Sequence, residues 1–91
     1  MNTKFDFTNK KVVVTGGAQG IGFAITKMFL SSGADVAIWD YNEETLKVAE
    51  SELSRFSDKL TTFKVDVTDA MNCNTVAAKT GTIDVLVNNA G

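Results

Sequence analysis

The segment KVVVTGGAQGIG, residues 11–22, places three patterns one after another. The β-branched run Val12–Val14 is bounded by glycines, which is typical of a short buried strand. A glycine-rich turn follows it. Beyond the turn, apolar residues recur at helical spacing and predict one core-facing side of a helix: Ile21, Ala24, Ile25, Met28 and Phe29. The segment therefore predicts a strand, a tight turn and a helix in direct succession.

The turn has a chemistry of its own. Glycines let the backbone approach a phosphate without a Cβ in the way. The start of the helix then offers free N–H groups and the positive end of its dipole. The spacing is Gly16-x-x-x-Gly20-x-Gly22, which is neither G-x-G-x-x-G nor a P-loop. We expect this turn to hold a pyrophosphate, with a plain strand-to-helix turn as the alternative.

The same alternation continues along the chain. Apolar runs predict further strands at residues 35–40, 61–65 and 83–87, with helical patterns between them. Asn42 is placed to cap the second helix and Thr68 to cap a short third helix, whose inward side would carry Ala70, Cys73, Val76 and Ala77.

Strands separated by helices run parallel, so the order βαβαβαβ predicts a Rossmann-type, doubly wound parallel sheet. For its strand order we adopt the usual one of such folds, 3-2-1-4. The sheet would form the N-terminal half of a three-layer α/β/α fold.

Composition excludes several classes of function. The chain has 91 residues, a net charge of −2, one cysteine and no histidine, enough for one domain. Hydrolysis with a histidine base and cysteine–histidine metal sites are excluded, so we expect no metal. The charge balance argues against nucleic acid as a partner. No apolar run approaches the roughly 18 residues of a membrane span, and residues 1–11 do not resemble a signal peptide. We expect a cytoplasmic protein with no membrane partner.

Asp40 ends the second predicted strand, 18 residues after Gly22. A carboxylate there can accept hydrogen bonds from the ribose hydroxyls of an adenosine, and its charge repels a 2′-phosphate. No arginine or lysine occupies the neighbouring positions Ala18, Gln19, Tyr41 and Asn42. Both facts favour NAD over NADP as the cofactor.

Four segments, in this order, resemble the short-chain dehydrogenases/reductases: the glycine turn at 15–22, Asp40 at a strand end, Asp66-Val67, and Asn88-Asn89-Ala90-Gly91. The resemblance covers essentially the whole chain but only the N-terminal part of a typical member. It implies that residues 1–91 are an NAD-binding segment, truncated from a larger single domain. The whole protein would be an NAD(H)-dependent oxidoreductase that transfers hydride between nicotinamide and a small-molecule alcohol or carbonyl substrate.

The resemblance also implies roles for individual residues. The pyrophosphate would be lined by Gly16, Gln19, Gly20, Ile21 and Gly22. Asp40 and the backbone of Tyr41 would hold the adenosine ribose, and Asp66 and Val67 would flank the adenine. The fourth strand end would approach the ribose and phosphates through Asn88, Ala90 and Gly91. Asn89 would be structural and tie its strand to the neighbouring one.

The family's catalytic residues are absent from these 91 residues. Members use a serine, and a tyrosine followed four residues later by lysine, all beyond the Asn-Asn-Ala-Gly segment. The single tyrosine here is Tyr41, and position 45 is threonine. We therefore assign no catalytic residue and expect no turnover by residues 1–91 alone. The region from Thr68 to Gly81 is also short for the family by roughly one helical turn.

Other interpretations stay open. The apolar strand at 83–87 would leave an exposed edge, so the chain is either a short domain whose edge is covered by dimerisation or the first part of a longer one. By the resemblance, the full protein is a homo-oligomer, a tetramer. The alternative functions are a non-catalytic nucleotide-binding module and an NADPH-dependent 3-oxoacyl thioester reductase.

Overall fold

The computed structural model describes residues 6–89. Ala90 and Gly91, to which the resemblance assigns cofactor contacts, lie outside the described residues. Strands and helices alternate along the chain in the following order: β1 (Lys11–Thr15), α1 (Gly20–Ser31), β2 (Asp35–Asp40), α2 (Glu43–Ser54), β3 (Leu60–Lys64), α3 (Ala70–Thr80) and β4 (Val85–Asn88). The predicted βαβαβαβ order is confirmed.

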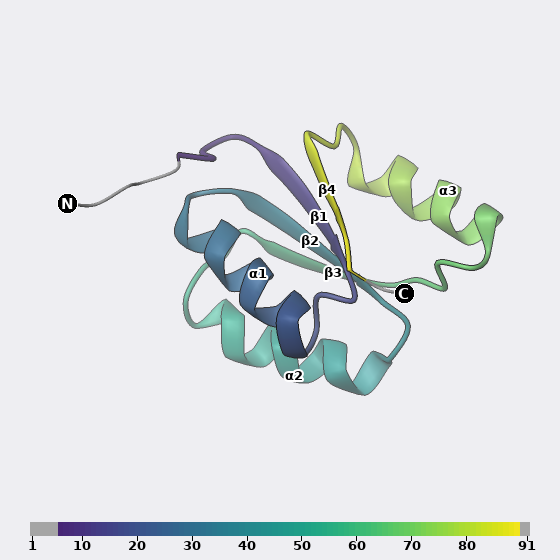
Figure 1. Ribbon diagram of the computed structural model, residues 1–91, viewed down its shortest axis with the longest axis horizontal. Helices are drawn as coiled ribbons and strands as arrows, with labels where there is room; N and C mark the ends of the chain where they lie inside the picture. The colour runs from purple at the N-terminus through teal and green to yellow at the C-terminus, as the bar shows by residue number, and fades with distance from the viewer. Residues whose placement is uncertain (1–5, 90–91) are drawn as a thin grey trace.

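The four strands form one parallel sheet in the order β3-β2-β1-β4, as expected. The central strand β1 pairs with β2 on one side and with β4 on the other, so that Thr15 lies opposite both Trp39 and Asn88. All four strands therefore end at the same edge of the sheet, where the loops that follow them gather (Figure 1).

Helices cover both faces of the sheet, which gives three layers (Figure 1). On one face, alternate residues of β1 and β2 such as Val14 and Ile38 pack against α1 and α2. On the other face, Val13, Ala37 and Trp39 pack with Val76 of α3. The buried positions alternate between two cores because successive side chains of a strand point to opposite faces.

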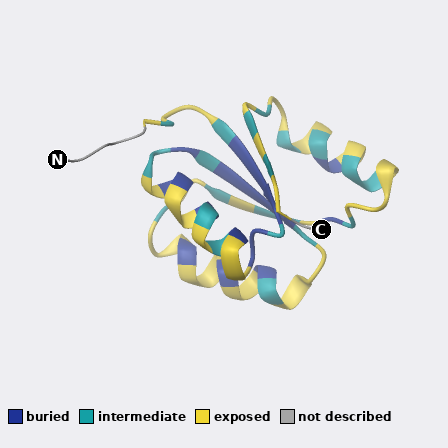
Figure 2. Cartoon of the chain, viewed as in Figure 1, coloured by how far each residue is buried: buried dark blue, intermediate teal, exposed yellow. Residues whose placement is uncertain are grey.

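The expected buried side of α1 is right in part. Phe29 is buried and Ile25 half-buried, as expected. Ile21 and Met28, however, are 74% and 55% exposed, and the helix also buries Gly22, Thr26 and Leu30, as the blue and yellow bands of α1 show in Figure 2. Gly22 has no side chain to collide with the Gly16 carbonyl group of the glycine loop. The hydroxyl of Thr26 is satisfied locally, because it donates to the Gly22 carbonyl oxygen at 2.9 Å. A glycine and a threonine thus occupy the core side that apolar periodicity assigned to larger residues.

The helix caps agree with expectation in one case and differ in the other. Asn42 caps α2, since its Oδ1 accepts from the N–H groups of Glu44 and Thr45 at 3.0 and 3.1 Å. The cap of α3 is Asp69 rather than Thr68: the Asp69 carboxylate accepts from the N–H of Asn72 at 3.2 Å.

The inward side of α3 matches expectation in part. Val76 is buried, and Cys73 and Ala77 are half-buried, but Ala70, the first residue of the helix, is exposed.

Two strands are shifted relative to the prediction. The third begins at Leu60 and ends at Lys64, and the fourth begins at Val85. Ile83, expected in the fourth strand, packs before it against the α3-side core. Within residues 6–89, no helix combines the length and apolar character that crossing a bilayer requires.

Candidate functional site

The glycine loop between β1 and α1 carries the first part of the site. Gly16 and Gly20 have φ angles of 65° and 60°, in the left-handed region that glycine adopts without a steric penalty. Gln19 occupies the N-cap position of α1 without a side-chain cap, and the first turn has no acidic residue. The N–H groups at this helix start are therefore left for an anion, which the helix dipole also favours.

Gly22 lies where two backbone segments meet. A Cβ built on Gly22 would stand 2.0 Å from the Gly16 carbonyl oxygen and 2.7 Å from Asn89 Nδ2. These groups are bonded to each other, because Asn89 Nδ2 donates to the Gly16 oxygen at 3.2 Å. The glycine loop, α1 and the end of β4 therefore pack so closely around Gly22 that this position has no room for a methyl group.

The end of β4 is also tied to the end of β1. The backbone N–H of Asn89 donates to Thr15 Oγ1 at 2.9 Å. The Thr15 hydroxyl lies 3.2 Å from Asn88 Oδ1 and 3.3 Å from the Val87 carbonyl oxygen, within donating distance of both. The structural tie expected of Asn89 is confirmed, and Thr15 is a positioning residue that the sequence patterns did not single out.

Asp40, the last residue of β2, faces the glycine loop. Its Oδ2 accepts from the N–H of Ala18 at 3.3 Å, and its Oδ1 accepts from the N–H of Asn42 at 3.1 Å. Each carboxylate oxygen can accept more than one hydrogen bond. The two backbone contacts therefore orient the carboxylate while leaving it able to accept from hydroxyl groups of a ligand.

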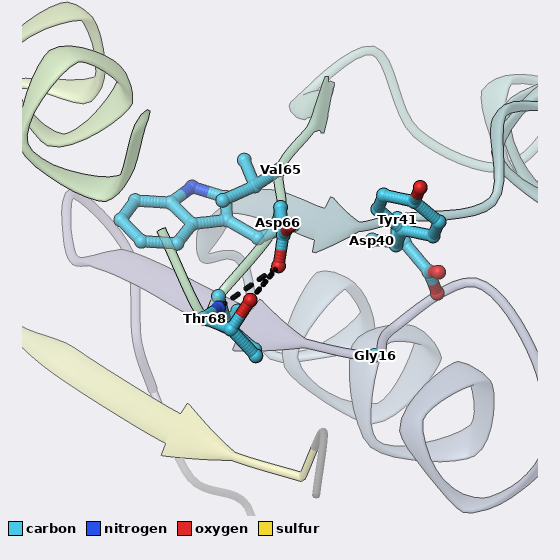
Figure 3. Close-up of a pocket in the computed structure, with 8 residues that line it drawn as sticks. Gly16, Asp40, Tyr41, Val65, Asp66 and Thr68 are labelled. Atoms are coloured by element: carbon cyan, nitrogen blue, oxygen red, sulfur yellow. Dashed lines mark hydrogen bonds between the residues drawn. The ribbon is translucent and has the colours of Figure 1, made fainter. Parts of the chain in front are cut away.

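A pocket of about 250 Å³ opens at the carboxyl ends of β1, β2 and β3 (Figure 3). It is lined by Gly16, Trp39, Asp40, Tyr41, Val65, Asp66, Val67 and Thr68. Sites for whole small molecules have volumes of about 300–1,000 Å³, so a pocket of this size fits one ring system of a larger ligand. Its position, where the strands end, is the usual ligand position in sheets of this kind.

Asp66 forms a compact turn at the rim of this pocket (Figure 3). The hydroxyl and the backbone N–H of Thr68 donate to Asp66 Oδ1 at 2.6 and 2.9 Å. These bonds favour the ionised form and lower the pKa of Asp66 below its ordinary value. In residues 6–89 the other oxygen, Oδ2, makes no hydrogen bond, so an ionised acceptor is available at the pocket.

Changing Thr68 to valine is expected to raise the pKa of Asp66 toward its ordinary value, because the hydrogen bond from the Thr68 hydroxyl is the largest cause of the lowered pKa. A lowered carboxyl pKa stabilises the fold above the unfolded-state pKa, and that contribution is lost as the pH falls through the folded-state pKa. Carboxyl titration by NMR measures the shift. Thr75→Val is the matched control, since the Thr75 hydroxyl donates to the Met71 carbonyl oxygen within α3 and, among residues 6–89, does not contact Asp66. An unchanged Asp66 pKa in Thr68→Val would contradict this account.

The structure brings most of the predicted site residues to one edge of the sheet. Gly16, Asp40, Tyr41, Asp66 and Val67 line the pocket. Four others form the loop and helix start beside it: Gln19, Gly20, Ile21 and Gly22. Asn88 ends β4 and is joined to this edge through Thr15. The site therefore combines a helix start, an oriented carboxylate and a pocket.

Two neighbours of the site were not predicted. Trp39 packs in the α3-side core and also lines the pocket, and it is 7% exposed. Its indole N–H has no hydrogen-bond partner among the described residues. Lys64 brings its Nζ to 5.9 Å from the ring centroid of Tyr41. No local pattern marks Lys64, because it reaches Tyr41 through strand pairing.

Comparison with known proteins agrees with this geometry. A family model described as short chain dehydrogenase matches residues 10–91. The 3-oxoacyl-(acyl-carrier-protein) reductase FabG of Chlamydia muridarum is 46% identical over 88 residues, which cover 91% of this chain and 36% of the reductase. A 3alpha-hydroxysteroid dehydrogenase of Mediterraneibacter gnavus is 38% identical over 89 residues, 91% of this chain and 36% of that enzyme.

Solved structures show the same likeness. The 2-keto-3-deoxy-D-gluconate dehydrogenase of Streptococcus agalactiae superposes with a TM-score of 0.88 at 34% identity, over 97% of this chain and 35% of that one. An NADPH-bound short chain oxidoreductase of Pseudomonas aeruginosa gives a TM-score of 0.91 at 36% identity, over 96% of this chain and 36% of that one. The present chain thus spans about a third of the length of these proteins.

Proposed function

The chain belongs to the short-chain dehydrogenase family, and on this premise we propose that it binds NAD(H) and forms the cofactor-binding part of an oxidoreductase. The whole protein would transfer hydride between the nicotinamide and an alcohol or carbonyl substrate. The bound nicotinamide supplies the hydride chemistry. The residues of this chain would grip the diphosphate, hold the adenosine and aim the cofactor.

One observation carries the proposal: the Asp40 carboxylate is bonded to the Ala18 N–H of the glycine loop. If the diphosphate of a dinucleotide lies at the start of α1, the Asp40 carboxylate beside it is therefore held in place to accept hydrogen bonds from the adenosine ribose. Gly16, Gln19, Gly20, Ile21 and Gly22 would contact the diphosphate, and Tyr41 would flank the ribose. Asp66 and Val67 would bracket the adenine, and Asn88, Ala90 and Gly91 would approach from the end of β4.

The choice of NAD rests on charge. An unphosphorylated ribose can donate two hydroxyl hydrogen bonds to Asp40, and such charge-assisted bonds are among the stronger ones. A 2′-phosphate would place negative charge against the same carboxylate, which bonds only to backbone N–H groups in the structure. We therefore propose NAD as the cofactor.

A second candidate is supported by the relatives. FabG proteins of Chlamydia are 43–46% identical to this chain, and one similar structure is described as NADPH-bound. An NADPH-dependent 3-oxoacyl thioester reductase is therefore the alternative function. Cofactor preference separates the two, because Asp40 opposes a 2′-phosphate.

The remaining features of the whole protein follow from the family as proposals. Its substrate would be a small-molecule alcohol or carbonyl compound, it would act in the cytoplasm, and it would assemble as a homotetramer. Tyr41 is at the pocket that we assign to the adenosine, so its hydroxyl has no catalytic role in this scheme. A catalytic tyrosine and lysine would have to come from sequence beyond residue 91.

The single tryptophan of the chain provides the test. Trp39 lines the pocket, and tryptophan emission overlaps the absorption of reduced nicotinamide, so bound NADH is expected to quench it. We expect saturable quenching with a dissociation constant within about 1 μM to 1 mM, the range common for enzyme substrates. ADP-ribose, which lacks nicotinamide, should compete. If neither NADH nor NADPH quenches Trp39 or releases heat in calorimetry, the proposal is wrong.

A further inference from the structure

Lys64 is the last residue of β3 and lies directly opposite Asp40 in the pairing of β3 with β2. Paired residues of neighbouring strands project to the same face of a sheet. The Lys64 ammonium group lies 5.9 Å from the ring centroid of Tyr41, which follows Asp40 and lines the pocket. A positive charge therefore stands next to the residues that we assign to the adenosine ribose.

This charge is not neutralised by a bonded carboxylate. Within residues 6–89 the side chain of Lys64 interacts with the Tyr41 ring and with no carboxylate. Asp40 directs its oxygens to the N–H groups of Ala18 and Asn42 instead. The two opposite charges on neighbouring strands thus remain separate, and each acts on whatever enters the space beside Tyr41.

NAD and NADP differ in that space by one phosphate. Building on the proposed nucleotide site, we propose that Lys64 is a specificity-determining residue: its ammonium group attracts the 2′-phosphate of NADP(H) and so opposes the repulsion by Asp40. The site then discriminates against NADP less strongly than Asp40 alone would dictate. Because Lys64 is exposed, its effect is modest and sensitive to salt.

The experiment measures dissociation constants of NADH and NADPH for the full chain and for Lys64→Gln, by calorimetry. Lys64→Gln is expected to weaken NADPH binding about three- to fivefold, as for one exposed ion pair, and NADH binding less than about twofold. The NADPH effect should shrink as ionic strength rises. Lys64→Arg keeps the charge and should retain the NADPH affinity of the unaltered chain.

Lys59→Gln is the matched control. Lys59 precedes the first residue of β3, so it stands roughly 16 Å from Lys64 along the same strand, well beyond the screening length of about 8–10 Å. It should leave the ratio of NADPH to NADH affinity unchanged.

Two outcomes would overturn the inference. If NADH binds the unaltered chain normally and Lys64→Gln leaves the affinity ratio unchanged, Lys64 has no role in specificity, while the proposed function survives. If the unaltered chain binds neither dinucleotide, the proposed function fails and the role of Lys64 fails with it.

Discussion

Replacing Gly22 with alanine is expected to lower the free energy of unfolding by about 3 kcal/mol, at the upper end of the cost of overpacking. The added methyl group would stand 2.0 Å from the Gly16 carbonyl oxygen and 2.8 Å from the Gly16 carbonyl carbon. Backbone cannot swing aside as a side chain can, so the loop or the helix must move. The same displacement separates Asn89 from Gly16, and we expect dinucleotide binding to be lost as well.

Urea denaturation of the variant and of a control measures this effect. Gly20→Asn is the control, because a Cβ at Gly20 meets nothing within 4 Å and asparagine tolerates a φ of 60° better than most residues. The control is expected to lose about 1 kcal/mol or less. Equal losses in the two variants would show that the crowding at Gly22 is not the cause.

Replacing Asp40 with alanine is expected to shift the preference between NADH and NADPH by about 1–3 kcal/mol toward NADPH, which is roughly a 5- to 150-fold change in the affinity ratio. NADH would lose charge-assisted bonds from its ribose hydroxyls. NADPH would be released from repulsion between its 2′-phosphate and the carboxylate, and Lys64 would remain to attract it. Competitive titration with the two reduced dinucleotides measures the ratio.

Asp35→Ala is the matched control for Asp40→Ala. Asp35 is the first residue of β2 and Asp40 the last, so both changes remove one negative charge from the same strand at opposite edges of the sheet. We expect Asp35→Ala to leave the affinity ratio unaltered. A preference for NADPH in the unaltered chain, or an equal shift in both variants, would refute the assignment of Asp40 as the residue that excludes the 2′-phosphate.

The features of the fold that depend on local pattern were predictable. Val12–Val14 and residues 35–40 form the expected strands because a β-branched or apolar run bounded by turn residues has few other ways to be buried. Asn42 caps α2 as expected because its side chain needs only the first N–H groups of its own helix. The observed strand order is the usual one of the doubly wound fold, although right-handed crossovers alone also allow other orders.

The buried side of α1 was only partly predictable from apolar spacing, which finds Phe29 but misses Gly22 and Thr26. Gly22 is buried because the loop passes over it, and Thr26 is buried because its hydroxyl is satisfied by the Gly22 carbonyl oxygen. Neither residue counts as apolar, so the pattern selected Ile21 and Met28, which are exposed. The predicted cap of α3 was also wrong. The Thr68 hydroxyl donates to the Asp66 carboxylate, and the adjacent Asp69 caps the helix.

The residues of the candidate site also differ in how far local sequence predicts them. The sequence places Gly16, Asp40 and Asp66 at or just beyond the carboxyl end of a strand and assigns each a ligand contact, and they do line one pocket. It assigns no ligand contact to Lys64 or Thr15. Their contacts with Tyr41 and Asn89 exist only after β2 has paired with β3 and β1 with β4. Local sequence therefore predicts the pocket-lining residues better than the residues that strand pairing brings beside them.

The side-chain amide that donates a hydrogen bond to the Gly16 carbonyl oxygen of the glycine loop belongs to Asn89, 73 positions after Gly16. During translation, the loop and its helix leave the ribosome long before this amide has been synthesised. A nascent chain that stops short of residue 89 can carry every glycine of the loop and still lack the bond that holds its carbonyl in place. The shape of the proposed phosphate-binding loop is thus completed late in synthesis, although its sequence is among the earliest made.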